Sequence, residues 1–295
     1  MKMRVVIILA LLLICIHAEE NKYRIENNLF VDGIKRYYTI NLPKEYEKFK
    51  SFPLIIAMHG GGGSAEQCEK DYDLNSTALP EKFAVVYPEG VRGSGLLRVR
   101  TWNAGTCCDN AVENNINDVK FISNLIEDLT TKYKVDPNRV YLTGMSNGAM
   151  MAYRLACEIS DKIAAIAVVS GTMTTKNICK PNRVVPILHI HSERDKKVPS
   201  AGGKGIRSYY FPSVDSTLKV WAAFDKCSAE PLVGKQKNYT KFVWKNESSQ
   251  IMIEYYLTKD GGHSWPGSKK NRLLADKPSK AIDANSLIVG FFKKH

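Results

Sequence analysis

Short apolar runs of four to seven residues recur along the chain without the strict alternation of half-exposed strands. Such runs are typical of strands covered on both faces of a sheet. Between them, apolar residues return at helical spacing, most clearly over residues 116–133. Strands that alternate with helices predict a mostly parallel α/β sheet with right-handed crossovers and helices on both faces. The predicted strands are residues 54–58, 83–87, 140–143, 163–169, 184–190 and 251–257, and further helices are predicted at 147–157, 214–224 and 281–293.

The N-terminal part of the chain shows two other patterns. Residues 23–42 alternate in hydrophobicity around Asp32-Gly33, which predicts an opening β-hairpin. Before it, Lys2 and Arg4 precede an apolar stretch over residues 5–16, and Ala18 offers a small residue for cleavage. This pattern predicts a secretory signal peptide over residues 1–18, and no stable membrane anchor. A short anchor or a lipoprotein signal at Cys15 is the alternative, although the bulky Ile14 disfavours the lipoprotein signal.

Composition narrows the class of protein further. The chain has 295 residues, of which 44% are hydrophobic and 24% charged, and its mean hydropathy is −0.25. These values exclude a disordered or collagen-like chain and a polytopic membrane protein. We find no repeat, linker or low-complexity tract, so residues 19–295 are expected to form one domain and a monomer. The net charge of +12 comes from scattered basic residues that are not interleaved with aromatic ones, so no nucleic-acid partner is expected.

The cysteines point to an oxidising compartment. Removal of the signal peptide would leave six of the seven cysteines, which suggests three disulfides in a secreted, extracellular protein. Fifteen pairings are open, and we expect only that Cys107 or Cys108 pairs outside its own loop. Three glycosylation sequons, at Asn75, Asn238 and Asn246, fit a secreted glycoprotein. The six cysteines are Cys68, Cys107, Cys108, Cys157, Cys179 and Cys227.

The most informative motif is Gly144-Met-Ser146-Asn-Gly148, which follows a β run and precedes an apolar helix. In this context Gly-x-Ser-x-Gly indicates a nucleophile elbow, a sharp turn that projects a serine hydroxyl above the sheet. Glycines on both sides remove Cβ atoms that would clash across the turn. Placing Ser146 at a helix N-terminus also directs the Asn147 amide toward a developing oxyanion.

A serine nucleophile needs a base, and the chain holds six histidines. His17 leaves with the signal peptide, His295 is the last residue, and His59 precedes Ser146. His263 follows the run at 251–257, inside a glycine-containing loop that can orient an imidazole. It is therefore the predicted base. His189 and His191 have the spacing of a metal pair on one strand face, but without a third ligand they are interpreted as buried strand histidines.

The acid that orients the histidine must emerge from a strand end between Ser146 and His263. Asp195 is favoured because it comes a few residues after the buried run at 184–190. Glu193 is the competing carboxylate in the same segment. Asp260 is a further candidate, whereas Asp161 follows the elbow helix too closely, and Asp215 and Asp225 lie on a predicted helix.

His59-Gly60-Gly61-Gly62-Gly63 follows the strand at 54–58 and supplies bare backbone amides near the first strand-to-helix crossing. We expect the Gly61 and Asn147 amides to form the oxyanion hole. A phosphate-binding glycine loop is the alternative, but Gly-Lys-Ser/Thr and a Gly-x-Gly-x-x-Gly register are both missing.

Together these blocks resemble the esterase family of polyhydroxybutyrate depolymerases and feruloyl esterases. The matching segments run in family order from about residue 30 to residue 290. They include Thr101-Trp-Asn-Ala-Gly-Thr-Cys-Cys108, Asn117-Asp118-Val-Lys-Phe-Ile122 and Gly262-His-Ser-Trp-Pro-Gly267, beside the elbow and the glycine loop. The residues before Asp195, which are small in the family, and Asn117-Asp118, a paired aspartate in the family, depart from its pattern.

The resemblance implies an α/β-hydrolase fold, a triad of Ser146, Asp195 and His263, and no cofactor. The expected function is a secreted serine esterase acting on feruloyl or acetyl esters of plant cell-wall polysaccharides. The substrate is then a small or polysaccharide-linked ester, on which Trp102 and Trp265 could stack. The alternatives are a hydrolase of hydroxyalkanoate esters and a catalytically inactive binding glycoprotein on the same scaffold.

Overall fold

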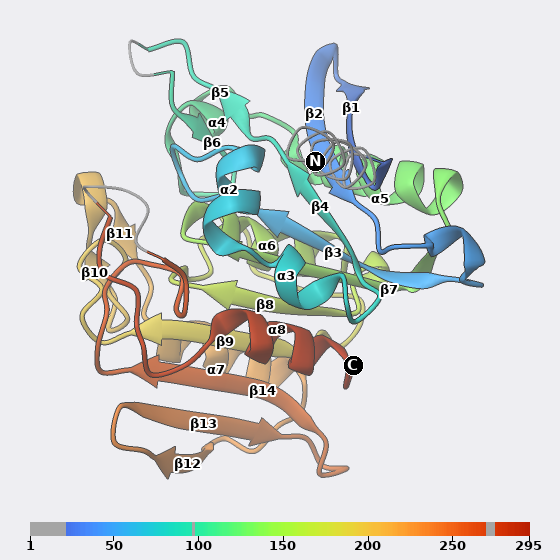
Figure 1. Ribbon diagram of the computed structural model, residues 1–295. Coiled ribbons are helices and arrows are strands. Elements are labelled where there is room, and N and C mark those ends of the chain that lie inside the picture. The colour runs from blue at the N-terminus through green and yellow to red at the C-terminus, as the bar shows by residue number, and fades with distance from the viewer. Residues whose placement is uncertain (1–21, 96–97, 270–274) are drawn as a thin grey trace, which may run out of the picture.

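A computed structural model describes residues 22–95, 98–269 and 275–295, and its centre is a ten-stranded sheet (Figure 1). The strand order is β1-β2-β4-β3-β7-β8-β9-β14-β13-β12. The six central strands pair in parallel, and an antiparallel hairpin completes each edge. In chain order the strands are β1 (Arg24–Val31), β2 (Ile34–Asn41), β3 (Phe52–Met58), β4 (Ala84–Pro88), β7 (Val135–Met145), β8 (Ala165–Val169), β9 (Ile187–Ser192), β12 (Leu232–Lys235), β13 (Tyr239–Lys245) and β14 (Ile251–Thr258).

Helices cover both faces of this sheet, as the α/β pattern predicts (Figure 1). One face carries α5 (Asp118–Lys132), α6 (Asn147–Glu158) and α7 (Val214–Phe224). The other carries α2 (Ala65–Tyr72), α3 (Asn75–Ala78) and α8 (Ala284–Phe292). Alternate residues of β3 enter the two cores: Leu54 and Ile56 pack on one side, and Ile55 and Ala57 on the other. The strands are therefore buried on both faces, which explains their unbroken apolar runs.

Local sequence signals account for most element boundaries. The side chains of Ser64, Asn117, Ser213 and Asp283 each accept a hydrogen bond from the backbone N–H three residues on, which caps α2, α5, α7 and α8. In the opening hairpin, Asp32 and Gly33 both have positive φ, as a type I′ turn requires. The predicted hairpin, central strands and four helices are thereby confirmed, with boundaries that shift by a few residues.

Smaller elements complete the fold. Two strand pairs form two-stranded sheets of their own, and short helices lie in the loops. None of the helices in the described ranges has the length and apolar character needed to cross a bilayer. The predicted signal peptide lies outside the described residues. The additional elements are β5 (Val91–Arg92), β6 (Arg100–Thr101), β10 (Gly203–Lys204), β11 (Tyr210–Phe211), α4 (Asp109–Glu113), and the 3-10 helices η1 (Tyr46–Lys48), η2 (Ser160–Lys162) and η3 (Ile206–Ser208).

The cysteines correct one expectation. Cys107 pairs with its neighbour Cys108, not with a partner outside the loop, and Cys157 pairs with Cys179. Cys68 and Cys227 are free thiols, so the residues that the structure describes contain two disulfides instead of three. Cys68 belongs to the core on one face of the sheet, whereas Cys227 packs against the core on the opposite face. A disulfide needs Cα atoms within about 7 Å, which this placement does not allow.

Candidate active site

Ser146 stands at the sharp turn between β7 and α6. Its φ of 56° and ψ of −121° lie outside the helical region, and it is the N-cap of α6. The turn is tight because a Cβ on Gly144 would lie 2.7 Å from the backbone carbon of Gly148, and a Cβ on Gly148 would lie 2.6 Å from the His59 carbonyl oxygen. The two motif glycines therefore permit the strained serine conformation that the elbow pattern predicts.

Asp195 and His263 lie together at the carboxyl ends of β9 and β14. His263 Nδ1 and Asp195 Oδ2 are 2.7 Å apart, a hydrogen bond in which the ring nitrogen donates to the carboxylate. Asp195 Oδ1 accepts from the backbone amides of Lys197 and Val198, each at 2.9 Å. Burial opposes ionisation of this carboxyl, but hydrogen bonds from His191 and His263 outweigh it and lower the pKa of Asp195. The group is therefore an anion at neutral pH.

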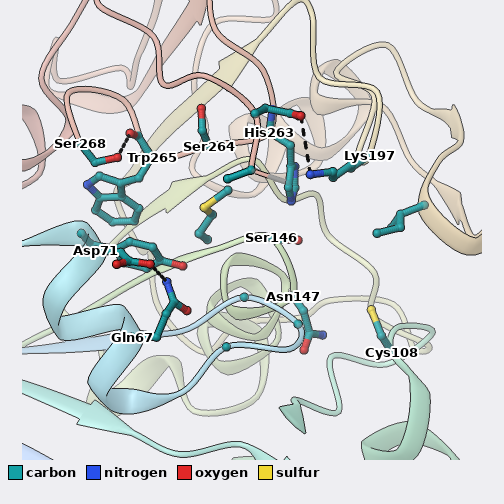
Figure 2. Close-up of a pocket in the computed structure, with 18 of the residues that line it drawn as sticks. Gln67, Asp71, Cys108, Ser146, Asn147, Lys197, His263, Ser264, Trp265 and Ser268 are labelled. Carbon is teal, nitrogen blue, oxygen red and sulfur yellow. Dashed lines mark hydrogen bonds and ion pairs between the residues drawn. The ribbon is translucent and has the colours of Figure 1, made fainter. Parts of the chain in front are cut away.

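The same cavity joins His263 to Ser146. Both residues line a pocket of about 360 Å³, and Figure 2 shows the His263 ring directed toward Ser146. Within the described part of the chain, the Ser146 hydroxyl makes no hydrogen bond to this ring. Bonds of this kind often tighten only when substrate is bound. The structure thus brings Ser146 and His263 to one pocket, and the buried Asp195 is already paired with His263.

The predicted oxyanion amides border the serine. Gly61 lies in the loop after β3, and a Cβ added to it would be 3.9 Å from the Asn147 Cβ. Both residues line the pocket beside Ser146. No hydrogen bond within the described ranges occupies the amide of Gly61 or of Asn147, so both are open to a ligand oxygen. The position of Asn147 at the N-terminus of α6 favours negative charge there.

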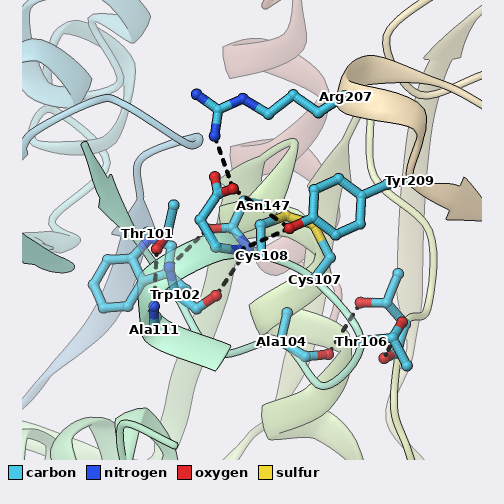
Figure 3. The surroundings of a disulfide bond; sticks show 12 residues. Thr101, Trp102, Ala104, Thr106, Cys107, Cys108, Ala111, Asn147, Arg207 and Tyr209 are labelled. Atoms are coloured by element: carbon cyan, nitrogen blue, oxygen red, sulfur yellow. Dashed lines mark hydrogen bonds and ion pairs between the residues drawn. A yellow bond between two sulfur atoms is a disulfide. The ribbon is translucent and has the colours of Figure 1, made fainter. Parts of the chain in front are cut away.

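Trp102 does not stack on a ligand, contrary to the sequence-based expectation, because its side chain is fully buried. Instead it links both sides of the oxyanion site (Figure 3). Its indole Nε1–H donates to the carbonyl of His59 at 2.9 Å, directly before the glycine loop. Its backbone N–H and carbonyl exchange two hydrogen bonds with the Asn147 side-chain amide, at 2.7 and 3.0 Å. Trp102 therefore fixes the position of Asn147 relative to the glycine loop.

Trp265 lines the pocket but exposes only 2% of its surface. Its ring stacks on Tyr72 at a centroid distance of 4.4 Å, and its Nε1–H donates to Asn285 Oδ1 at 2.9 Å. These contacts fix the indole as one wall of the pocket. Ligand contact at this wall is limited to the small exposed edge.

The remaining candidates do not line the pocket. His189 and His191 are buried on β9, which confirms their interpretation as buried strand histidines. Glu193, Asp161 and Asp215 are exposed, away from the His263 ring.

Two residues at the site were missed by sequence reasoning. Asp276 Oδ2 accepts the backbone N–H of His263 at 2.8 Å, which anchors the histidine loop. Asp118 accepts the Asn103 backbone N–H at 2.7 Å and an Arg36 Nη2–H at 2.6 Å, which ties the loop carrying Trp102 to β2 and α5. Asp118 belongs to a segment that resembles the family, but nothing in the spacing along the chain indicates its partners.

The disulfide between Cys107 and Cys108 also borders the pocket (Figure 3). It precedes Asp109, whose carboxylate accepts a hydrogen bond from Arg207 at 2.7 Å. The backbone N–H of Asp109 donates to the Tyr209 hydroxyl at 3.1 Å. These contacts attach the segment around η3 to the opposite wall, so the pocket has structured sides on both flanks of Ser146.

Comparisons with known proteins agree with this geometry. The model of the family described as Esterase PHB depolymerase matches residues 37–211. Feruloyl esterase B from Piromyces equi is 29% identical over 237 residues, which cover 78% of this chain and 42% of that protein. The bifunctional acetylxylan esterase/xylanase XynS20E from Neocallimastix patriciarum is 32% identical over 72% of this chain and 29% of its own length. The chain therefore spans less than half the length of these two relatives.

Solved structures support the fold. An acetyl xylan esterase from Aspergillus awamori superimposes with a TM-score of 0.60 at 17% identity, covering 81% of this chain and 94% of that one. At this identity the likeness concerns the fold alone, and it confirms the predicted α/β-hydrolase architecture. The family model covers more than half of the chain, including the glycine loop, the elbow and Asp195. The chain therefore belongs to the Esterase PHB depolymerase family of α/β-hydrolases.

Proposed function

We propose that this protein is a serine carboxylic-ester hydrolase with Ser146 as nucleophile, His263 as general base and Asp195 as the acid that orients the histidine. The amides of Gly61 and Asn147 form the oxyanion hole. The observation that carries this proposal is the 2.7 Å pairing of Asp195 with Nδ1 of His263, a residue that lines the same pocket as the strained Ser146.

The reaction follows from these positions. His263 Nε2 removes the Ser146 proton as the serine oxygen attacks the ester carbonyl. The carbonyl oxygen becomes an oxyanion that accepts from the two backbone amides. Collapse of the intermediate expels the alcohol, which takes the proton from His263 and leaves an acyl-serine. Water then attacks the acyl group by the same route and releases the carboxylic acid.

Feruloyl or acetyl esters of plant cell-wall polysaccharides are the proposed substrates. The support is the similarity to the feruloyl and acetylxylan esterases described above, which extends over about three quarters of this chain. The pocket is compatible with a small acyl group, since its volume of about 360 Å³ is at the lower end of the range for ligand sites. A hydroxyalkanoate ester is the second candidate, favoured by the description of the matching family.

We further propose that the protein is secreted as a monomer after removal of residues 1–18. The pattern of the N-terminal residues supports cleavage, and the two disulfides suit an oxidising compartment. Among the sequons, Asn238 is exposed and suited to carry a glycan. The Asn75 amide instead bonds to Glu69 and Tyr87, contacts that a glycan would disturb.

The test is hydrolysis of methyl ferulate, an acetylated xylan oligomer and a hydroxybutyrate dimer ester by the wild type and a Ser146→Ala variant. Ser228→Ala is the matched control, because Ser228 is exposed and its hydroxyl bonds only locally, to the Glu230 carbonyl. We expect one substrate class to be hydrolysed, with kcat/KM reduced by several orders of magnitude in Ser146→Ala and unchanged in Ser228→Ala. Equal activity of wild type and Ser146→Ala would contradict the serine mechanism. No hydrolysis of any ester would instead favour the inactive binding protein.

A further inference from the structure

A line of buried polar side chains leads from the core to Asp195. The Tyr153 hydroxyl on α6 lies 2.7 Å from His189 Nδ1 on β9. His189 Nε2 lies 3.1 Å from His191 Nδ1, two residues along the same strand. His191 Nε2 then lies 2.8 Å from the carbonyl oxygen of Val198 and 3.3 Å from Asp195 Oδ2. All three side chains are at most 1% exposed, so no water is needed to complete the chain.

The positions of the hydrogens along this line of side chains follow from the two acceptors at one end, the Val198 carbonyl and the Asp195 carboxylate. A carbonyl and an ionised carboxylate can only accept, so His191 Nε2 must carry the hydrogen that it directs at Val198 and Asp195. In the neutral ring His191 Nδ1 is then an acceptor, and His189 Nε2 must donate to it. By the same reasoning His189 Nδ1 accepts from the Tyr153 hydroxyl. Every hydrogen bond therefore points toward Asp195.

Electrostatics supports these protonation states. Burial, together with the neighbouring His191 ring, holds the pKa of His189 well below its usual range. Burial also raises the pKa of the Tyr153 hydroxyl well above its usual value. His189 and Tyr153 therefore favour their neutral forms, which suits an acceptor and a donor at the inner end of this line.

We propose that His191 is a positioning residue for the triad, which holds Asp195 by donating its Nε2–H toward the oxygen that also accepts from His263. This inference rests on the proposed function, because it assigns a role within that site. It goes beyond the triad itself, since the sequence and the burial alone leave His191 as a strand histidine with a packing role.

The geometry explains what His191 contributes. Asp195 Oδ1 is already held by two backbone amides, whereas Oδ2 faces only side chains: His263 Nδ1 at 2.7 Å, and His191 Nε2 at 3.3 Å, which also contacts the Val198 carbonyl at 2.8 Å. A second donor at Oδ2 resists rotation of the carboxylate out of the plane of the His263 ring. It also withdraws electron density from the oxygen that stabilises protonated His263, so His191 makes Asp195 a weaker partner for the imidazolium. Removing the donor should consequently strengthen the attraction between Asp195 and the imidazolium and move the acid limb of kcat/KM to higher pH.

Other titratable side chains lie near this line of buried residues, and a test of His191 must leave them unchanged. Tyr255 of β14 meets the His189 ring edge-on at 5.2 Å. Asp276 holds the His263 backbone and lies 3.7 Å from Lys197. The variants below leave these groups, and the triad, in place.

The experiment compares His191→Gln, His191→Asn and Tyr153→Phe with the wild type. The amide nitrogen of a glutamine reaches the place of the His191 Nε2, whereas that of an asparagine ends near the place of Nδ1. Tyr153→Phe removes one hydrogen bond from the same line of buried side chains, at a position separated from Asp195 by His189 and His191. Active sites are counted with a serine-reactive fluorophosphonate, so that kcat refers to folded protein only. In addition, kcat/KM is measured as a function of pH, and its fall on the acid side (the acid limb) is compared between variants.

Positioning by His191 predicts different outcomes for the three variants. In His191→Asn, kcat should fall roughly 10- to 100-fold with little change in KM, and the acid limb should move to higher pH. His191→Gln should retain most of the activity and the wild-type limb. Tyr153→Phe should lose stability only.

A purely structural role predicts another pattern. Equal kcat values and equal acid limbs for His191→Asn and His191→Gln would overturn the proposal, and so would an equal loss of kcat in Tyr153→Phe. The Ser146→Ala comparison is run in parallel. If that variant retains activity the esterase mechanism itself fails, a result distinguishable from failure of the His191 role.

Discussion

At the scale of single residues, Trp102 acts on a site that its side chain never enters. The indole joins the His59 carbonyl, and the backbone on either side holds the Asn147 amide. Trp102→Phe keeps most of the ring volume but leaves the buried His59 carbonyl without this donor, which costs about 1–3 kcal/mol. We expect a lower free energy of unfolding in urea and a kcat per active site reduced about tenfold, because the glycine loop is no longer tied to Asn147.

The control for this prediction is Trp221→Phe. Trp221 is also buried, but its indole nitrogen has no hydrogen-bond partner in the described ranges. Its replacement should change stability through packing alone and leave kcat per active site unchanged. Equal kcat values for the two variants would show that the indole bond of Trp102 does not reach the oxyanion site.

Asp225 offers a pH-dependent prediction at the same scale. The side chain is 3% exposed at the end of α7, and burial raises its pKa to about 7 against the opposing effect of the Val185 backbone. In the unfolded chain this carboxyl ionises above about pH 4. Between about pH 4 and pH 7 the unfolded state therefore releases a proton that the folded state keeps, and stability falls as the pH rises.

Asp225→Asn removes this dependence, because an amide stays neutral in both states. We expect the variant to be more stable than the wild type by roughly 4 kcal/mol at pH 8 and nearly equal at pH 4, measured by urea denaturation. Asp161→Asn, at an exposed position, serves as the control with no such difference. A stability gain that is the same at both pH values would mean that ionisation of Asp225 is not its cause.

At the scale of elements, one buried ion pair joins three parts of the fold. Arg36 on β2 donates to Asp118 at the start of α5, and Asp118 holds the Asn103 amide of the loop that carries Trp102. Both charged side chains are at most 3% exposed. Removing one partner leaves the other charge buried and uncompensated, so Asp118→Asn should lower the free energy of unfolding by about 3 kcal/mol or more.

A double-mutant cycle checks that prediction. Arg36→Met combined with Asp118→Leu should be less destabilised than the sum of the two single variants, because no unpaired charge remains. The exposed pair of Lys48 and Glu45 is the comparison, and its removal should leave the free energy of unfolding nearly unchanged. Additive effects at Arg36 and Asp118 would contradict a coupled pair.

Elements with a strong internal pattern could be predicted from the sequence, and the others could not. The central strands are recognisable because both of their faces are buried, and α5 because its apolar residues form one stripe. β12 is exposed at every position, and β13 has lysines within its apolar run, so neither differs clearly from a loop. The polar α2 buries only Ala65, Cys68 and Tyr72 and gives an equally weak signal.

At the scale of the whole molecule, the site could be predicted as far as the strand order brings its parts together. Gly61, Ser146, Asp195 and His263 each follow a parallel strand, namely β3, β7, β9 and β14. Carboxyl ends of parallel strands meet at one edge of a sheet, so residues directly after the strands converge there. The partners of these residues come from loops whose course depends on tertiary packing. The contacts of Trp102, Asp276 and His191 therefore had no signal along the chain.

The same argument applies to the cysteines, since a count of thiols says nothing about which face of the sheet each one occupies. Cys68 and Cys227 belong to opposite faces and should both remain thiols. Burial raises the pKa of Cys227 to about 11 and that of Cys68 well above its usual value, so alkylation at pH 8 should be slow in the folded protein. In denaturant without reductant, peptide mapping should find label on Cys68 and Cys227 and none on the other four described cysteines. After reduction all six should carry label, whereas a peptide cross-linked through Cys68 and Cys227 would contradict the two-disulfide arrangement.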